Sequence, residues 1–187
     1  MVELTVSMTL LLILTAIAIP SLMHSLRTYQ LNDAAARLSD MLKFTRFEAV
    51  RRNTQINFLM LPSGTGWIVG TDSNNNGSID TTEKQQLIAG FATLLSSGVA
   101  PSPTAISAAL GGAALTTLSG SAGSVTFDAR GAIRTGIGGA ISGSVYVFYV
   151  GAAANPDNFG YRAVVLLPSG ATQMWTAPAG GPWQQTA

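Results

Sequence analysis

The sequence predicts an α+β protein in which one long N-terminal helix packs on a β domain. Three observations predict this fold. The first 26 residues are almost entirely apolar, residues 27–53 carry one apolar stripe at helical spacing, and the remaining chain alternates β-prone runs with Gly and Pro turns. We therefore divide the chain into an apolar half-helix at 1–26, an amphipathic half-helix at 27–53 and a globular β domain at 54–187.

The apolar head is long enough to cross a lipid bilayer. From Leu4 to Leu26 there is no formally charged residue, and a helix of this length spans roughly 34 Å, against about 30 Å of hydrocarbon. Glu3 stands beside this run, and Pro20 lies inside it, where it is expected to kink or loosen the helix. A signal peptide has a basic start and a shorter apolar stretch, so the acidic start disfavours that interpretation. A simple anchor leaves Glu3 unexplained.

The helix is expected to continue past the apolar head with a different character. Apolar residues recur at helical spacing between Leu31 and Ala49, and acidic residues precede basic ones by three or four positions, which stabilises a helix. Asn53 is a plausible terminator. The sequence therefore predicts one helix of about fifty residues, far longer than usual in soluble proteins. Something outside the chain must bury its first half.

Strand signals follow the helix. The clearest strands are expected at 144–150 and 161–167, and further candidates are 55–61, 67–71, 87–95, 125–127 and 171–176. The segments 161–167 and 171–176 are joined by Pro-Ser-Gly and form an expected hairpin. Residues 96–124 are rich in Gly, Ser and Ala, and we interpret them as a long surface excursion with a short helix at 104–110.

Composition excludes several kinds of chemistry. Charged residues make up 10% of the chain, against about 25% in soluble proteins, and the net charge is +1. The absence of cysteine excludes disulfides, thiolate catalysis and Cys-ligated metals, and a single histidine leaves little acid–base chemistry. We predict that the protein is not an enzyme and requires no cofactor. His24 and Arg27 are expected as polar groups where the helix leaves the membrane.

One motif carries metal chemistry. Residues 72–83 match the calcium-loop pattern D-x-[DN]-x-[DN]-G-x₅-E, in which alternate oxygen side chains converge on the ion. The candidate ligands are Asp72, Asn74, Asn76, Ser78, Asp80 and Glu83. An EF-hand needs flanking helices, whereas residues 67–71 look like a strand. The alternative is therefore a polar hairpin tip that binds no metal.

The N-terminal motif resembles the type IV pilin superfamily. A Glu near the start, an apolar run and a Pro seventeen positions after the Glu are typical of a processed pilin, and Glu3 and Pro20 stand in these places. The later segments are similar to the GspH/FimT class of pseudopilins and minor pilins. They are KFTRFEAVRRN at 43–53, GWIVGTDSNNNGSID at 66–80, VTFDARGAIR at 125–134 and YRAVVLLPSGATQMW at 161–175. The resemblance implies that two further residues and a basic leader precede Met1.

The resemblance implies a pilin fold, with the second half of the helix on a small antiparallel sheet. The apolar half would lie in the inner membrane before assembly and in the central bundle of an extracellular filament, or of a periplasmic pseudopilus, afterwards. Glu3 would meet the N-terminal amine of a neighbouring subunit, so that Glu3 and Pro20 are the assembly residues. The implied partners are further copies of the chain, other pilins, prepilin peptidase and the assembly machinery.

The resemblance implies a structural subunit of a type IV pilus or pilus-like filament. The alternative is a minor pseudopilin of a type II secretion system. Some FimT-like minor pilins bind DNA through basic residues near the C-terminus, but Ser169–Ala187 contains no Lys or Arg. Because phosphate contacts need such charges, the sequence argues against a nucleic-acid partner.

Overall fold

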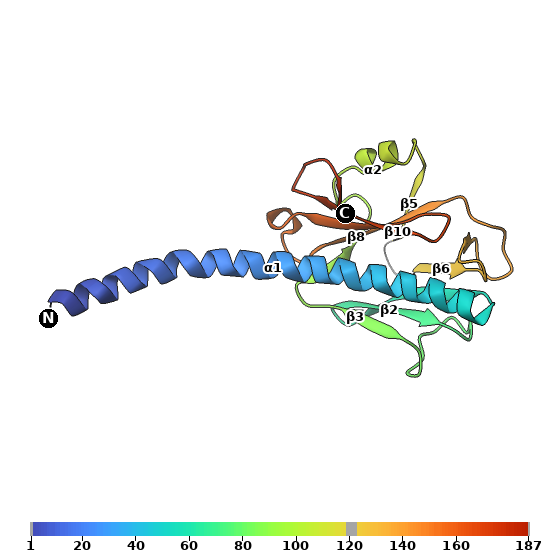
Figure 1. The fold of residues 1–187 in the computed structure, drawn as a ribbon, viewed down its shortest axis with the longest axis horizontal. Coiled ribbons are helices and arrows are strands. Elements are labelled where there is room, and N and C mark those ends of the chain that lie inside the picture. The colour runs from blue at the N-terminus through green and yellow to red at the C-terminus, as the bar shows by residue number, and fades with distance from the viewer. Residues whose placement is uncertain (1, 119–122, 187) are drawn as a thin grey trace.

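The first element of the fold is the helix α1, Val2–Arg52, seen here in a computed structural model that describes residues 2–118 and 123–186. The first half of α1 projects as a rod, and its second half lies on the globular domain (Figure 1). The prediction of one continuous long helix is confirmed. It ends where Asn53 takes a left-handed conformation, with φ of 52°, as expected for a helix terminator.

Charged side chains stabilise the second half of α1. Arg37 pairs with Asp33 at 2.7 Å, four residues apart, and this exposed pair contributes a few tenths of a kcal/mol. At the end of the helix, Glu48 is buried and accepts hydrogen bonds from Arg51 and Arg52. The hydrogen bond from Arg51 has the largest effect on the pKa of Glu48, and the two arginines outweigh the opposing effect of burial and lower it to about 2. Glu48 is therefore ionised at physiological pH.

The globular domain contains two β-sheets. Neighbouring strands are antiparallel, except that β5 pairs in parallel with β8. The five-stranded sheet has the order β3 (Gln85–Ile88), β2 (Gly66–Asp72), β1 (Ile56–Ser63), β6 (Gly123–Phe127) and β7 (Ile133–Arg134). The six-stranded sheet has the order β11 (Gln184–Thr186), β10 (Thr172–Ala177), β9 (Tyr161–Leu166), β8 (Val145–Ala152) and β4 (Ala92–Leu95), with β5 (Leu115–Thr117) beside β8.

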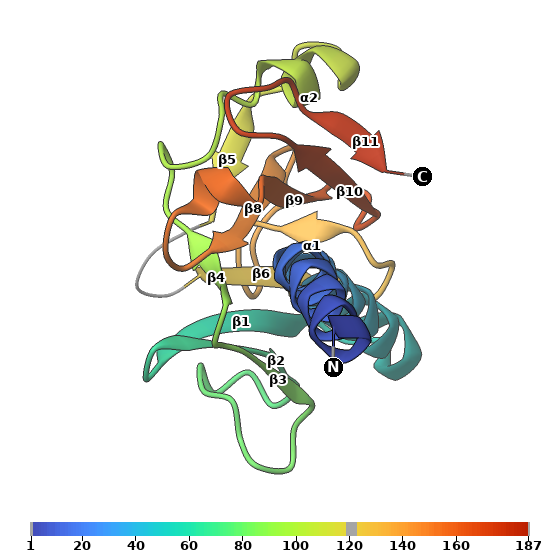
Figure 2. The same cartoon turned by 90° about the vertical axis from the view of Figure 1, so that its left-hand side faces the viewer.

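The second half of α1 packs against both sheets. Figure 2 looks along α1 and shows β1, β2 and β3 to one side of it, with β8, β9 and β10 to the other. Leu31, Leu38 and Leu42 of α1 are fully buried in a core shared with both sheets. Phe58 of β1 and Phe148 of β8 meet edge to face, with ring centroids 6.0 Å apart, so they join the two sheets directly. The α+β fold with a helix on antiparallel sheets is confirmed.

The six-stranded sheet is covered on both faces, which explains the unbroken apolar run of β8. Phe148 and Val150 face the core under α1, whereas Val145 and Val147 face a second core. Side chains of a strand alternate between its two faces, so both faces of β8 are apolar. The short helix α2, Thr104–Ala109, covers the second core with the fully buried Ile106.

Two expected segments differ from the structure. The run 87–95, expected as one strand, is broken where Gly90 takes a φ of 88°, and its halves become β3 and β4 in different sheets. The predicted excursion 96–124 contains α2 close to the expected position, but it also contains β5 and the start of β6. The Trp183 indole N–H donates to the carbonyl of Pro101 at 3.2 Å and so attaches the segment 96–124 to the chain just before β11. Residues 119–122 lie outside the described part.

Candidate assembly surface

The first half of α1 is an apolar surface without a partner in its own chain. We call residues 2–26 the exposed half-helix. Its large apolar side chains are between 47% (Met23) and 76% (Val2) exposed. Its most apolar window has a mean hydropathy of 2.2, none of it is buried, and by length and composition it is able to cross a membrane. An apolar surface of this size needs cover from lipid or from other polypeptides.

The hydroxyl groups of the exposed half-helix are satisfied within it. Thr5, Ser7 and Thr9 each donate to a backbone carbonyl three or four residues earlier, at 2.8 Å, and Thr15 does the same at 3.0 Å. Such bonds remove the cost of placing a hydroxyl donor in an apolar environment. The segment therefore presents no unsatisfied donor to lipid or to a neighbouring helix through these side chains.

Glu3 and Pro20 both lie on the exposed half-helix. The Glu3 carboxylate has no hydrogen bond or ion pair to any of residues 2–118 and 123–186. It lies in the first turn of α1, where the helix dipole stabilises its charge but supplies no counter-ion. α1 continues through Pro20 without a break, so the helix is not interrupted where a kink or loosening is expected. Figure 1 shows the exposed part of α1 as a gently curved rod. The two residues lie on separate turns and do not meet. Their roles in assembly remain predictions.

A cluster of four side chains fixes the point where the half-helix leaves the domain. We call His24, Arg27, Phe91 and Phe159 the junction cluster. The His24 ring stacks on Phe159 at 5.2 Å, Phe159 meets Phe91 edge to face at 4.9 Å, and the Arg27 guanidinium lies 4.5 Å from the centre of the Phe91 ring. Two residues one turn apart on α1 thus hold two aromatic rings of the β domain.

The junction cluster adds contacts that the sequence did not predict for His24 and Arg27. Both are expected as polar groups where the helix leaves the membrane, and in the structure both also contact aromatic rings of the domain. Sequence reasoning missed Phe91 and Phe159 because they are far apart in the chain. The available signals were weak: each ring stands beside a glycine with positive φ, at Gly90 and Gly160.

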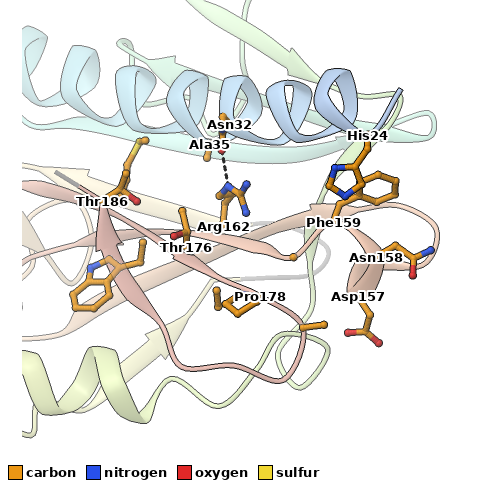
Figure 3. A pocket seen from close by; sticks show the side chains of 15 residues that line it. His24, Asn32, Ala35, Asp157, Asn158, Phe159, Arg162, Thr176, Pro178 and Thr186 are labelled. Atoms are coloured by element: carbon orange, nitrogen blue, oxygen red, sulfur yellow. Dashed lines mark hydrogen bonds between the residues drawn. The ribbon is translucent and has the colours of Figure 1, made fainter. Parts of the chain in front are cut away.

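A groove beside α1 begins at the junction cluster. It has a volume of about 620 Å³ and lies between α1, β9, β10, β11 and the 3₁₀ turn η1, Pro156–Asn158. Figure 3 shows His24 against Phe159 at one end, and Arg162 bonded to Asn32 of α1 further along. The Arg162 Nε donates to Asn32 Oδ1 at 2.6 Å. Burial lowers the pKa of this guanidinium, and it has no carboxylate partner in the described chain.

The six candidate calcium ligands lie together in the loop between β2 and β3. Asp72 is fully buried and accepts from the backbone N–H of Asn76 and Gly77, at 3.1 and 2.9 Å. Glu83 accepts from the backbone N–H of Ser73 and Asp80, at 2.6 and 2.9 Å. Burial raises the pKa of Glu83, but these hydrogen bonds outweigh it and lower the pKa overall. Both carboxylates therefore already accept hydrogen bonds from backbone N–H groups of the loop.

The amide groups of the loop do not point their oxygens at a common centre. The Nδ2 atoms of Asn74 and Asn76 donate to Asp80 at 2.8 and 3.0 Å. Within residues 2–118 and 123–186, no three or more His, Asp or Glu side chains are grouped so that they would hold a metal ion. Because β2 and β3 are paired strands, the loop forms the tip of a hairpin, and calcium binding there stays a prediction.

Thermal unfolding in calcium and in a chelator distinguishes these two interpretations. Because the loop carboxylates are satisfied by backbone N–H groups, we expect the same Tm in millimolar calcium and in EDTA. An upward shift in calcium, absent with magnesium and abolished in Glu83→Gln, would contradict this expectation and would establish a calcium site.

The comparisons with known proteins agree with this architecture. The family described as Type II transport protein GspH matches residues 34–170. Among solved structures, the type IV minor pilin FimU of Pseudomonas aeruginosa is similar, with a TM-score of 0.52, 17% identity, and coverage of 84% of this chain and 93% of that chain. A second crystal form of FimU gives a TM-score of 0.47 at 18% identity, with 83% and 97% coverage. No curated protein matches the chain.

Proposed function

Because this chain belongs to the pilin-like GspH family, we propose that it is a structural subunit that polymerises into a pilus-like filament through its exposed half-helix. The family and the fold are those of structural pilins and not of enzymes. The chain would lie in the inner membrane before assembly, held by the half-helix. In the filament, the half-helices of many copies would cover one another.

The single observation that carries this proposal is the exposure of the half-helix. Fourteen large apolar side chains between Val2 and Leu26 are exposed. Complete burial of such a side chain contributes about 1.5–3 kcal/mol, so covering half of this surface supplies on the order of 10–20 kcal/mol for each subunit. Lipid supplies a similar environment, which allows the same segment to serve as an anchor first and as a filament core later.

Glu3 gives the polymer a register. A carboxylate in an apolar bundle costs about 2.5–3.5 kcal/mol unless it is paired. The N-terminal ammonium group of a neighbouring subunit is the nearest source of compensating charge in a parallel bundle. Because only one axial stagger brings the two groups together, the pair would select that stagger from many that bury equal apolar area.

A minor pseudopilin of a type II secretion system is the second candidate. The family description as a type II transport protein favours this role. A minor subunit would use the same half-helix but would join a filament built mainly from other pilins. The two roles therefore share one mechanism and differ in whether this chain forms fibres alone.

Electron microscopy of the purified protein tests the proposal. We expect the full chain to form regular fibres when detergent is removed, and a variant lacking residues 1–22 to stay monomeric. This truncation keeps His24 and Arg27, so the junction cluster is retained. Fibres that appear only after other pilins are added would assign the minor role. A full chain that stays dispersed as single molecules in buffer without lipid or detergent would refute polymerisation.

A further inference from the structure

We propose that the groove between α1 and the β9–β10–β11 edge binds the exposed half-helix of a second copy of this chain. This inference rests on the proposed function and adds a specific docking surface to it. The exposed half-helix of one subunit would then contact the globular domain of the next subunit as well as the α1 helix of that subunit.

The size of the groove suits one face of a helix. A volume of about 620 Å³ takes roughly four leucine-sized side chains, the number that a docked helix presents at positions i, i+3, i+4 and i+7. Apolar groups of Ala35, Phe159, Met174 and Pro178 contribute to its lining. The exposed half-helix offers such a face on any side, because it is apolar all round.

The groove is continuous with the exposed half-helix. It begins at His24, where the half-helix ends, and follows α1 as far as Ala35. A parallel helix that packs on the half-helix of one copy therefore enters the groove if it continues along α1. For residues 2–26 of the second copy to lie beside 24–35 of the first, the axial offset must be roughly 14–33 Å at 1.5 Å per residue.

The half-helix adds no second cation to the groove and offers hydrogen-bond acceptors to Arg162. Arg162 lies half-buried in the groove without a carboxylate partner in residues 2–118 and 123–186, so its occupant must not bury a second cation beside it. Residues 4–26 carry no formal charge. The hydroxyl oxygens of Thr9 and Thr15, which donate to their own helix, keep lone pairs that accept hydrogen bonds from a guanidinium group.

Disulfide mapping in assembled fibres tests this docking. Because the chain contains no cysteine, every disulfide that forms must join two introduced cysteines. We would place one cysteine on the groove rim, as Pro178→Cys or Thr186→Cys, both at exposed positions. A second cysteine scans the half-helix from Leu10 to Leu14. We expect intermolecular disulfides at half-helix positions three or four apart, at least tenfold above the control.

The control is Ile141→Cys, which is also exposed but pairs with Arg134 of β7 in the five-stranded sheet and does not line the groove. Fibres that form normally, but in which neither rim position reacts with any half-helix position, would overturn the groove and leave polymerisation intact. Equal reaction of rim and control positions would also overturn it. If the unmutated chain forms no fibres, either alone or with other pilins, the proposed function and this inference are refuted together. A lipid in the groove would protect the rim cysteines from alkylation in bilayers. Rim cysteines that are protected in fibres but form no disulfide with any half-helix position would refute the docking.

Discussion

Glu3→Ala is expected to leave the protein inserted in the membrane and to reduce its fibre yield at least tenfold. The substitution removes the carboxylate that has no partner in its own chain and leaves a neighbour's ammonium group uncompensated in the bundle. At about 2.5–3.5 kcal/mol for an unpaired charge at the centre of a bilayer-spanning helix, each subunit contact weakens by a factor of about 100. Membrane fractionation and fibre counts by electron microscopy measure the two quantities separately.

Two matched variants identify the cause of the loss. Glu3→Gln keeps the size of the side chain but not its charge, so it should behave like Glu3→Ala if pairing is what matters. Ser7→Ala, one turn further along, removes a hydroxyl that bonds only within its own helix and should leave the fibre yield unchanged. Normal fibres from both Glu3 variants would show that apolar burial alone sets the register.

The long helix could be predicted from the sequence because its determinants are local. Apolar spacing between Leu31 and Ala49, acid-before-base pairs and a terminal Asn53 all act within a few residues. The strongest strands, β8 and β9, could be predicted for the same reason, since their aromatic and β-branched content is high. The exposure of residues 2–26 also follows from sequence, because a helix that is apolar all round has more apolar surface than packing on one side covers.

The groove and the junction cluster could not be predicted, because they depend on contacts between distant residues. His24 contacts Phe159 and Arg162 contacts Asn32, and these pairs exist only where α1 packs beside β9 of the six-stranded sheet. The short strands β7 and β11 were missed because two or three residues carry no periodicity. The described strands change sheet at three points along the chain, after β3, after β5 and after β7, and the residues of a strand do not by themselves determine which sheet it joins.

The loop at 72–83 shows how a pattern of residue types can agree with two chemistries. The pattern places oxygen-bearing side chains at alternate positions, which suits a cation, but Asx-type hydrogen bonds to the backbone of a tight turn need the same residues. In the structure both oxygens of Asp72 accept backbone N–H groups. The pattern therefore predicts that a polar loop forms at 72–83. Whether its side-chain oxygens bind a cation or accept hydrogen bonds from the backbone depends on the orientation of those side chains.

The largest expected effect on the stability of the globular domain comes from Phe58→Ala. Phe58 is fully buried and contacts Phe148 across the two sheets, so its removal leaves a cavity in the shared core. Truncation of a buried Phe costs about 3–5 kcal/mol. Urea unfolding of the variant that lacks residues 1–22 measures this loss.

Phe47→Ala provides a control of identical chemistry, because Phe47 lies on α1 with 64% of its surface exposed. Its removal should change the free energy of unfolding by less than about 0.5 kcal/mol. Similar losses from the two variants would mean that the sheets are not joined through Phe58. With the domain destabilised and the half-helix intact, full-length Phe58→Ala should still enter the membrane but should form few fibres, since assembly then lacks the folded domain that holds α1 in place.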